Sequence, residues 1–200
     1  MNIFRNAAGK MVSIGVLALQ GDFAKHMHTL QTLKAHAIEV RTSADLNRCS
    51  GLIIPGGEST TMLRQIEANN LKKGLLEFAA RHPLFGTCAG LILMSKEVLN
   101  YPMQPLGLLD LQVERNAYGR QIESFIGEVD LFLEKRPRTM KGIFIRAPKI
   151  RATAPEVKIL ASYKDEPVAV QQGRHLACSF HPELLGETVL HKYFLDRLLA

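Results

Sequence analysis

Residues 84–90 read LFGTCAG and decide the fold, because a short apolar strand, a G-x-C-x-G turn and the start of an apolar helix follow one another there. Glycines at positions 86 and 90 permit a turn in which larger side chains would clash. This order predicts a nucleophile elbow that lifts Cys88 out of a sheet and into a crevice. The helix that starts at Ala89 points its positive end at the sulfur and favours the thiolate. A small buried cysteine is the other interpretation of these residues, so the surrounding sequence has to decide.

Strand-like and helix-like patterns alternate on both sides of this turn. Short apolar or β-rich runs occupy residues 13–19, 37–41, 51–54 and 84–86. Helix-like patterns occupy residues 23–35, 59–69, 71–81 and 89–99. Such alternation implies a largely parallel sheet with helices on both faces and ligands at the carboxyl ends of its strands. We therefore predict an α/β fold of the flavodoxin-like, three-layer kind.

The second half of the chain is richer in strands than in helices. Its β-rich pieces occupy residues 111–114, 125–132, 141–145, 157–163, 167–171 and 175–180. We interpret them as antiparallel additions and closing strands of the same sheet, followed by a final helix over residues 187–199. No Gly/Ser-rich linker or internal repeat divides the chain, so we expect one domain over residues 13–200. Residues 1–12 are expected to be an extension or an upstream start, because Met11 stands just before the first strand.

Composition narrows the class of protein. The 200 residues are 46% hydrophobic and 22% charged, which suits one sizeable core and argues against disorder. The formal charge is +6, but the 25 Lys and Arg residues are scattered without a run of five, so we expect no nucleic-acid partner. Three cysteines without a C-x-x-C pair argue against a disulfide framework and a zinc site. A reducing cytoplasm fits these cysteines best, and we expect no metal and no cofactor. We also expect neither a membrane span nor export, because no apolar run reaches roughly 20 residues and no signal peptide is recognisable.

A base for Cys88 is offered by the segment FHPE, residues 180–183, which directly follows a strand-like run. The proline restricts His181 to extended geometry, and residues two apart in an extended segment project to the same side. Glu183 can therefore reach the imidazole, fix its tautomer and stabilise the imidazolium. A chance pair at the end of a surface strand is the competing interpretation. We expect solvated or packing roles for the other histidines, which are His26, His28, His36, His82, His175 and His191.

Residues 55–61 read PGGESTT and form a glycine turn between a strand and a helix. Free backbone N–H groups in such a turn make a donor nest, which can hold the oxyanion of a tetrahedral intermediate if it lies opposite the elbow. A plain turn with Ser59 or Thr60 as the helix N-cap also fits. A phosphate-binding loop does not fit, because no G-K-[ST] follows.

The motifs PGG, G-x-C-x-G and H-P-E occur in this order, and the chain thereby resembles the class I glutamine amidotransferases. A closer resemblance, from about residue 13 to residue 198, is to the glutaminase subunits of pyridoxal 5′-phosphate synthases. It rests on GVLALQG (15–21), PGGESTT (55–61), GTCAG (86–90), LGLLD (106–110), VERNAYGR (113–120), FIRAP (144–148) and SFHPEL (179–184). The elbow and H-P-E mark the superfamily, whereas VERNAYGR and FIRAP single out this family.

The resemblance implies a mechanism and a set of site residues. Cys88 would attack the carboxamide of L-glutamine, His181 would protonate the departing ammonia with Glu183 completing the triad, and water would hydrolyse the glutamyl thioester to glutamate. The backbone N–H groups of Gly57 and Ala89 would form the oxyanion hole. Contacts with glutamine would come from Gly57, Glu58, Ser59, Arg115, Ile145 and Arg146. An arginine guanidinium suits this work, because it can bind the α-carboxylate through two parallel hydrogen bonds.

The resemblance also names a partner, the ammonia-using synthase subunit of pyridoxal 5′-phosphate synthase, in a hetero-oligomeric complex. Glutamine hydrolysis alone wastes nitrogen, and the motifs leave no room in this chain for an ammonia-using site. A protected route between subunits is expected, because in neutral water most ammonia becomes unreactive ammonium. The helix over residues 23–35, with Lys25, His26 and His28 near its active-site end, is expected to dock the partner, although a solvated helix face fits as well.

Three other interpretations stay open. The partner could be a different synthase, such as that of imidazole glycerol phosphate or guanylate synthesis, and only VERNAYGR and FIRAP speak against it. A cysteine hydrolase or chaperone-like relative would use an elbow cysteine without H-P-E. An idle regulator or nucleic-acid binder is suggested only by the basic pI of about 9.3. Glycines at 56 and 57 also permit a peptide flip, so the oxyanion turn could form only on docking.

Overall fold

The computed structural model describes residues 12–118, 124–133 and 138–199, and in that part of the chain the central sheet has nine strands in the order β2-β1-β3-β4-β12-β11-β10-β7-β8. The parallel half consists of β1 (Ser13–Leu17), β2 (His36–Val40), β3 (Gly51–Ile54), β4 (Leu84–Thr87) and β12 (His175–Cys178). The antiparallel half consists of β7 (Phe125–Leu131), β8 (Arg138–Phe144), β10 (Lys158–Tyr163) and β11 (Glu166–Gln172). The predicted α/β class with antiparallel additions is confirmed.

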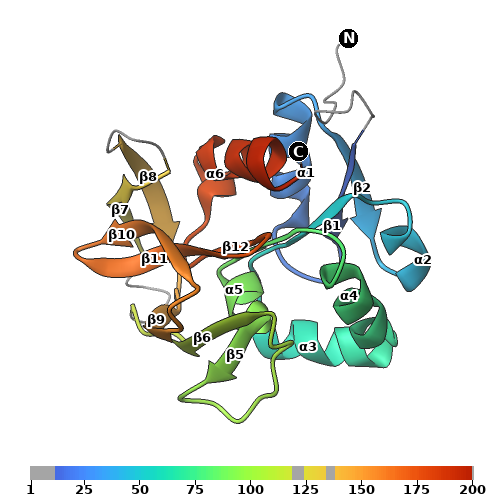
Figure 1. Ribbon diagram of the computed structural model, residues 1–200, viewed down its shortest axis with the longest axis horizontal. Coiled ribbons are helices and arrows are strands. Elements are labelled where there is room, and N and C mark those ends of the chain that lie inside the picture. Colours follow the sequence, from blue (N-terminus) through green and yellow to red (C-terminus); the bar gives the residue numbers. More distant parts are fainter. Residues whose placement is uncertain (1–11, 119–123, 134–137, 200) are drawn as a thin grey trace.

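Helices on both faces of this sheet produce three layers (Figure 1). One face carries α1 (Phe23–Thr32), α6 (Val189–Tyr193) and η3 (Phe194–Leu198), a wider π-helical turn that continues α6. The other face carries α3 (Ser59–Ala68), α4 (Leu71–Ala79) and α5 (Ala89–Met94). The short α2 (Ser43–Leu46) packs against α4 and β2. The predicted three-layer arrangement is therefore confirmed.

Two hydrophobic cores fill the spaces between these layers. Strand side chains alternate between the two faces, so Leu52 and Ile54 of β3 enter one core while Ile53 enters the other. On β4, Leu84 packs toward α4 and α5, and Phe85 packs edge-on against His191 of α6. Apart from Thr87, the residues of β3 and β4 are apolar, and both strands are buried on both faces, as is usual for central strands of a parallel sheet.

A second, smaller sheet contains β5 (Ser95–Val98), β6 (Leu109–Glu114) and β9 (Lys149–Thr153) in the order β5-β6-β9. The prediction that the second-half strands all join one sheet is therefore wrong for β6. Its alternate residues Leu109, Leu111 and Val113 are buried in the same core as α3, α4 and α5. The strand thus covers the open end of that helical layer instead of extending the central sheet.

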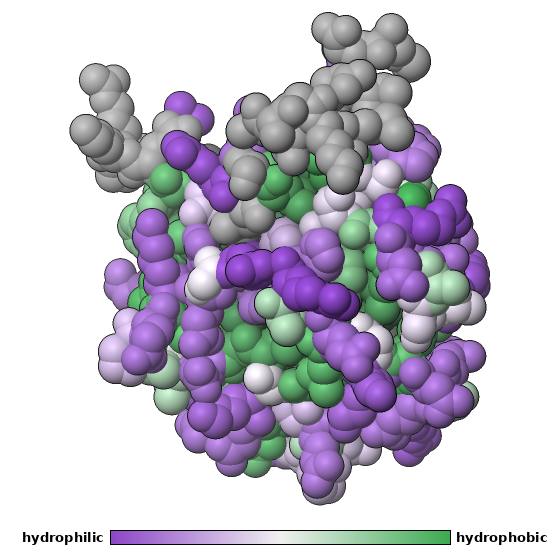
Figure 2. Space-filling model, turned by 45° about the vertical axis from the view of Figure 1, so that its right-hand side comes forward, coloured by the Kyte–Doolittle hydropathy of each residue, from purple (hydrophilic) through white to green (hydrophobic). Residues whose placement is uncertain are grey.

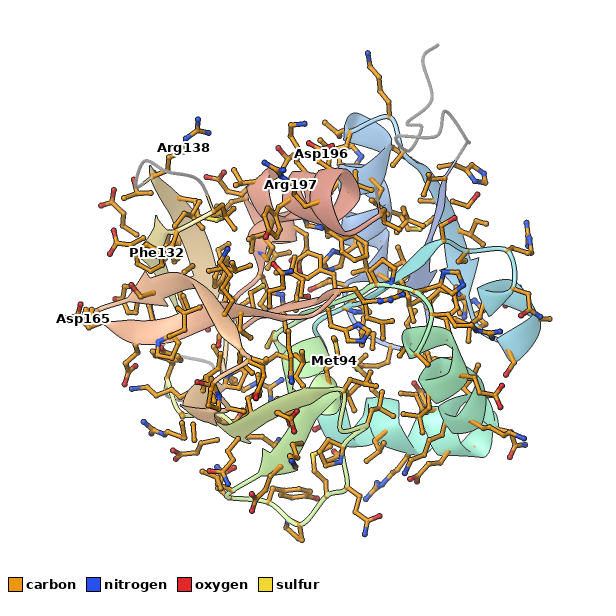
Figure 3. The ribbon with its side chains drawn as sticks, viewed as in Figure 1. Met94, Phe132, Arg138, Asp165, Asp196 and Arg197 are labelled. Atoms are coloured by element: carbon orange, nitrogen blue, oxygen red, sulfur yellow. The ribbon has the colours of Figure 1, made fainter. Side chains whose placement is uncertain are left out.

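The helix after the elbow is shorter than predicted. It was expected over residues 89–99 but ends at Met94, after which Ser95 adopts extended geometry and begins β5. The Ser95 hydroxyl donates to the carbonyl of Ile92 at 2.8 Å, which occupies one of the carbonyls left free at the helix end. Pairing of β5 with β6 then overrides the helical pattern. Figure 3 shows Met94, fully buried, in the interior near α5, whereas Asp165 projects outward beyond the β10–β11 hairpin.

The carboxyl ends of the parallel strands converge on one edge of the sheet. Strand β1 lies between β2 and β3, so the chain order reverses there, and ligands of such folds bind at this switch point. The loops after β1, β3, β4 and β12 all reach this edge, and the short 3-10 helix η2 (Pro182–Leu184) follows β12. These loops contain three of the sequence motifs, which the fold thereby brings together.

The surface mixes polar and apolar residues. In Figure 2, hydrophilic side chains dominate the visible face, with hydrophobic areas between them. No helix within the described ranges is long and apolar enough to span a membrane. The expected extension up to residue 11 and the last two residues of VERNAYGR, Gly119 and Arg120, lie outside the described residues.

Candidate active site

Cys88 occupies a strained turn between β4 and α5. Its φ of 48° and ψ of −100° are rarely adopted by residues other than glycine, and such strain concentrates at functional sites. The turn is fixed by the Cys88 N–H, which donates to the carbonyl of Cys178 at 2.8 Å. A Cβ at Gly90 would overlap the carbonyl oxygen of Ile54, so only glycine allows α5 to start this close to β3. The predicted elbow is thus formed, with the sulfur 3.8 Å from the carbonyl oxygen of Ile145.

His181 and Glu183 follow β12 and form a close pair. Nδ1 of His181 lies 2.7 Å from Oε1 of Glu183, and both side chains are buried. The His181 N–H donates to the carbonyl of Ile143 at 2.9 Å, which ties the segment to β8. A Cβ at Gly56 would overlap the imidazole, so this glycine makes room for the ring. Because Nδ1 faces the carboxylate, Nε2 is the ring nitrogen left for Cys88.

The protonation of His181 follows from its neighbours. Burial alone would lower its pKa, but interactions with Cys88 and Glu183 outweigh burial and raise the pKa to about 10. The imidazole therefore carries its second proton at neutral pH. An imidazolium held beside a cysteine is the arrangement that activates sulfur nucleophiles.

The other two cysteines are poor nucleophiles. Burial raises the pKa of Cys49 to about 11 and raises that of Cys178 well above its usual range. The Cys178 thiol donates to the carbonyl of Phe180 at 3.3 Å and is fully buried. Of the three cysteines, Cys88 is therefore the one with both a base and a pocket.

The glycine turn after β3 is held by Gln20, which follows β1. The side-chain oxygen of Gln20 accepts from the backbone N–H of Glu58 at 2.8 Å. Gly57 lines the pocket beside this contact. Ala89 is the first residue of α5, so its N–H has no acceptor within the helix. Of the two predicted oxyanion donors, Gly57 thus lies in the turn after β3 and Ala89 directly follows Cys88 at the start of α5. Gln20, which was not singled out from the sequence, anchors the turn that contains Gly57.

Arg115 is held in place from two sides. Its Nη2 lies 2.9 Å from Oε1 of Glu58, and its guanidinium lies 4.4 Å from the ring centre of Tyr101. Burial by itself would raise the pKa of Glu58, but hydrogen bonds from Thr60 and Thr61 lower it to about 2. The carboxylate is therefore charged at neutral pH and orients the guanidinium without using all its donors.

One pocket of about 300 Å³ connects these groups. The hydroxyl of Ser59, at 2% exposure, has no hydrogen-bond partner among the described residues, so a polar ligand could satisfy it. Glu183 lies behind His181 and does not line the pocket. The lining includes Cys88, His181 and all six predicted glutamine contacts: Gly57, Glu58, Ser59, Arg115, Ile145 and Arg146. Residues that sequence reasoning missed complete it, namely Gln20, Gly21, Asp22, Ile92 and Asn116.

His26 does not lie on the exposed side of α1, where a docking residue would have to lie. The prediction that it belongs to a docking surface is wrong, because its side chain is fully buried. The physical reason is its place on the inward face of α1, which also contains Thr29 and Leu30. Lys25 and His28 on the same helix are exposed.

A cation site can be tested against the same residues. Asp22, His181 and Glu183 each place one potential ligand atom within 4.8 Å of the others. A histidine ligand must be unprotonated, yet the pKa of His181 is raised and its Nδ1 already bonds to Glu183. This donor set fits an imidazolium–carboxylate pair better than a metal ion.

Comparisons with known proteins agree on one family. The model of the SNO glutamine amidotransferase family matches residues 16–200. A pyridoxal 5′-phosphate synthase subunit PdxT from Solibacter usitatus is 47% identical over 192 residues, covering 94% of this chain and 100% of the relative. The PdxT subunit of Pseudothermotoga lettingae is 49% identical, covering 92% and 95%. A crystal structure of a glutamine amidotransferase superposes with a TM-score of 0.86 at 45% identity, covering 93% of this chain and 98% of that chain.

Proposed function

This chain belongs to the SNO glutamine amidotransferase family, and we propose that it is the glutaminase subunit of a pyridoxal 5′-phosphate synthase. It hydrolyses L-glutamine to L-glutamate and ammonia, and the ammonia serves vitamin B6 biosynthesis. The observation that carries this proposal is the 2.7 Å contact between His181 and Glu183 at the pocket that contains Cys88. Relatives that are named as this subunit and match over almost their whole length support the choice of synthase.

The first half of the reaction makes a thioester. The Cys88 sulfur attacks the side-chain carbonyl carbon of glutamine, and the carbonyl oxygen becomes an oxyanion held by the N–H groups of Gly57 and Ala89. His181 then donates its Nε2 proton to the amide nitrogen, the C–N bond breaks, and ammonia leaves. Glu183 stabilises the imidazolium before this transfer and keeps Nε2 directed at the reacting atoms.

The second half of the reaction regenerates the enzyme. A water molecule gives a proton to the neutral His181 and adds to the thioester carbonyl, and the same two N–H groups hold the new oxyanion. The C–S bond breaks, glutamate forms, and the Cys88 sulfur returns to its starting state. One carboxylate, Glu183, supports the imidazole in both halves.

The pocket wall selects the amino-acid end of the substrate. The guanidinium of Arg115 binds the α-carboxylate. Its contact with Glu58 uses one nitrogen, so the remaining N–H donors are left for the substrate. The unpaired hydroxyl of Ser59 and the polar groups of Ile145 and Arg146 complete the contacts. These assignments follow from the pocket lining and from the family resemblance.

The ammonia-using synthase subunit is the partner in a hetero-oligomeric complex. The exposed side of α1, with Lys25 and His28, is the proposed docking surface, since it begins at the loop that lines the pocket. Residues 13–200 act as one glutaminase domain, and the three unpaired cysteines suit the reducing cytoplasm.

A partner-exchange assay tests the proposal. Ammonia and glutamate release from glutamine is measured with this chain alone, with a pyridoxal 5′-phosphate synthase subunit, and with the synthase subunit of imidazole glycerol phosphate synthase. We expect the first synthase to stimulate release and the second to leave it unchanged. Stimulation by the second synthase alone would overturn the assignment of the partner but keep the glutaminase.

A further inference from the structure

A buried pair of histidines lies directly behind the carboxylate of the triad. His26 on α1 is fully buried, and its Nε2 lies 3.6 Å from Oε1 of Glu183 and 3.2 Å from the hydroxyl of Thr87. Its Nδ1 lies 2.9 Å from Nε2 of His191 on α6, which is also fully buried. The imidazole of His26 therefore lies where four elements meet, namely α1, β4, α6 and η2. Thr87, which it contacts, directly precedes Cys88 in the chain.

The two histidines are neutral, so each ring carries one proton, and its position is inferred from the hydrogen-bond partners. Burial lowers the pKa of His26 well below its usual value and that of His191 to about 3. A neutral imidazole has one N–H and one acceptor nitrogen. Nδ1 of His191 has no partner within the described residues, and a buried acceptor is left unpaired more often than a buried donor. The N–H of His191 therefore points from Nε2 to Nδ1 of His26, and His26 directs its own N–H from Nε2 toward Glu183 and Thr87.

Glu183 needs such a donor. Its side chain is fully buried, Oε1 bonds to His181, and Oε2 has no partner among the residues that the structure describes. A buried carboxylate with so few hydrogen bonds is costly unless neighbouring donors stabilise it. Nε2 of His26 lies 3.6 Å from Oε1, the oxygen that accepts from His181, which is an electrostatic approach rather than a hydrogen bond; the hydrogen-bond partner of Nε2 is the Thr87 hydroxyl at 3.2 Å.

We propose that His26 is a positioning residue, which holds the Glu183 carboxylate against the catalytic imidazole and is itself oriented by His191. This inference rests on the proposed function, because the imidazole it serves is that of His181. Without the His26 N–H, the carboxylate rotates away from Nδ1, and the imidazolium loses its stabilising charge. This loss of stabilisation slows the transfer of the proton to the departing amide nitrogen more than it weakens the binding of glutamine.

The expected pH effect takes account of every charged group near the pair. These groups are His191 from α6, His181 and Glu183 from the η2 segment, the two cysteines beside them, Cys88 and Cys178, and Asp22 at the start of α1. On this proposal, replacing His26 changes the contact between His181 and Glu183 and leaves the contact between His181 and Cys88 in place. The alkaline limb of kcat/KM, where His181 loses its proton, should therefore move to lower pH.

Three variants test the proposal in the complex with the synthase subunit. His26→Leu removes both ring nitrogens, and His26→Gln keeps an N–H donor near the position of Nε2. His36→Gln is the control, at an exposed histidine on β2 away from the pocket and the docking surface. We expect His26→Leu to lower kcat about 10-fold or more with KM changed less than about twofold. His26→Gln should recover most of kcat, and His36→Gln should behave as the wild type. Equal kcat and pH profiles for His26→Leu and the wild type would overturn the proposal, even if His26→Leu melts at a lower temperature. An equally impaired His26→Gln would also overturn it.

Two further measurements cover the case in which His26→Leu does not fold and the case in which the proposed function is wrong. If His26→Leu does not fold, His191→Phe replaces it, because a phenyl ring can pack against Phe85 as the His191 ring does but cannot orient His26. It should shift the alkaline limb in the same direction, and an unchanged limb would refute the proposal. NMR titration of the His181 ring in the isolated chain needs neither glutamine nor partner, and its midpoint should fall by about one pH unit in His26→Leu. An unchanged midpoint would contradict the role of His26, whereas a wild-type chain without glutaminase activity would contradict only the proposed function.

Discussion

Nδ1 of His181 lies 2.7 Å from Oε1 of Glu183, with the imidazole 5% exposed and the carboxylate residue 4% exposed. In such a buried position, an ion pair with good geometry is strong and loses little to solvent screening. The pair fixes which ring nitrogen faces Cys88, and it keeps the second proton on the ring at neutral pH. The proposed chemistry of the pocket depends on this one contact more than on any other.

Replacing Glu183 with glutamine should therefore impair the chemical step. The carboxamide keeps the shape of the side chain but not its charge, so it no longer stabilises the imidazolium. We expect kcat to fall about 100-fold or more, with a smaller change in KM. Steady-state glutamate release in the complex measures both constants. Glu187→Gln, four residues further on and outside the pocket, is the control and should keep the wild-type rate. A Glu183→Gln enzyme with wild-type kcat would show that the carboxylate is not used.

The raised pKa of His181 also predicts how stability depends on pH. A group whose pKa is raised on folding contributes stability below its unfolded value of 6.5, and the contribution is lost as pH rises through about 10. The free energy of unfolding should therefore differ more between wild type and His181→Gln at about pH 6 than at about pH 10.5. Urea denaturation at both pH values measures this difference. A constant difference would mean that folding leaves this pKa unchanged.

Gly90 offers a test of the elbow itself. Adding a Cβ there would force the backbone of α5 against the carbonyl oxygen of Ile54, and neither backbone segment can yield. We expect Gly90→Ala to lower the free energy of unfolding by about 4 kcal/mol or more. Gly107→Ala is the matched control, because Gly107 has a φ of 68° but no atom within 4 Å of an added Cβ, so only about 1–2 kcal/mol of backbone strain is expected. Equal losses in thermal or urea unfolding would contradict the close packing of the elbow.

Arg115 should act on substrate binding. Lysine at this position keeps the charge but cannot reproduce the two parallel hydrogen bonds of a guanidinium or its stacking on Tyr101. We expect Arg115→Lys to raise KM for glutamine about 10-fold with a smaller effect on kcat. Arg64→Lys, exposed on α3 and outside the pocket, should change neither constant. An unchanged KM for Arg115→Lys would assign the α-carboxylate to another residue.

Much of the fold and the main part of the site could be predicted because the signals are local. The elbow depends on glycines two residues from Cys88, and the imidazole–carboxylate pair on residues two apart in the chain. Strands β1, β3 and β4 contain short apolar runs, which predict burial on both faces of the sheet.

What the sequence did not reveal depends on contacts between distant segments. Strand β5 exists because β6 pairs with it, and its sequence SKEV has no strong strand pattern of its own. His26 and His191 are 165 residues apart, so no spacing rule connects them. One signal was available for His26, since it lies three and four residues before Thr29 and Leu30 on the buried side of α1. A polar residue on an apolar helix face needs a partner, which the fold supplies from α6.

The central claim is that Cys88 carries the glutamyl group, and acid-quenched mass spectrometry of the complex during turnover tests it most directly. Wild-type chain with excess glutamine should gain the mass of one glutamyl group on the peptide that contains Cys88. Cys88→Ala should show no adduct and no release of glutamate above background, whereas Cys178→Ala should keep the adduct. Release of glutamate at the wild-type rate by Cys88→Ala would contradict the account.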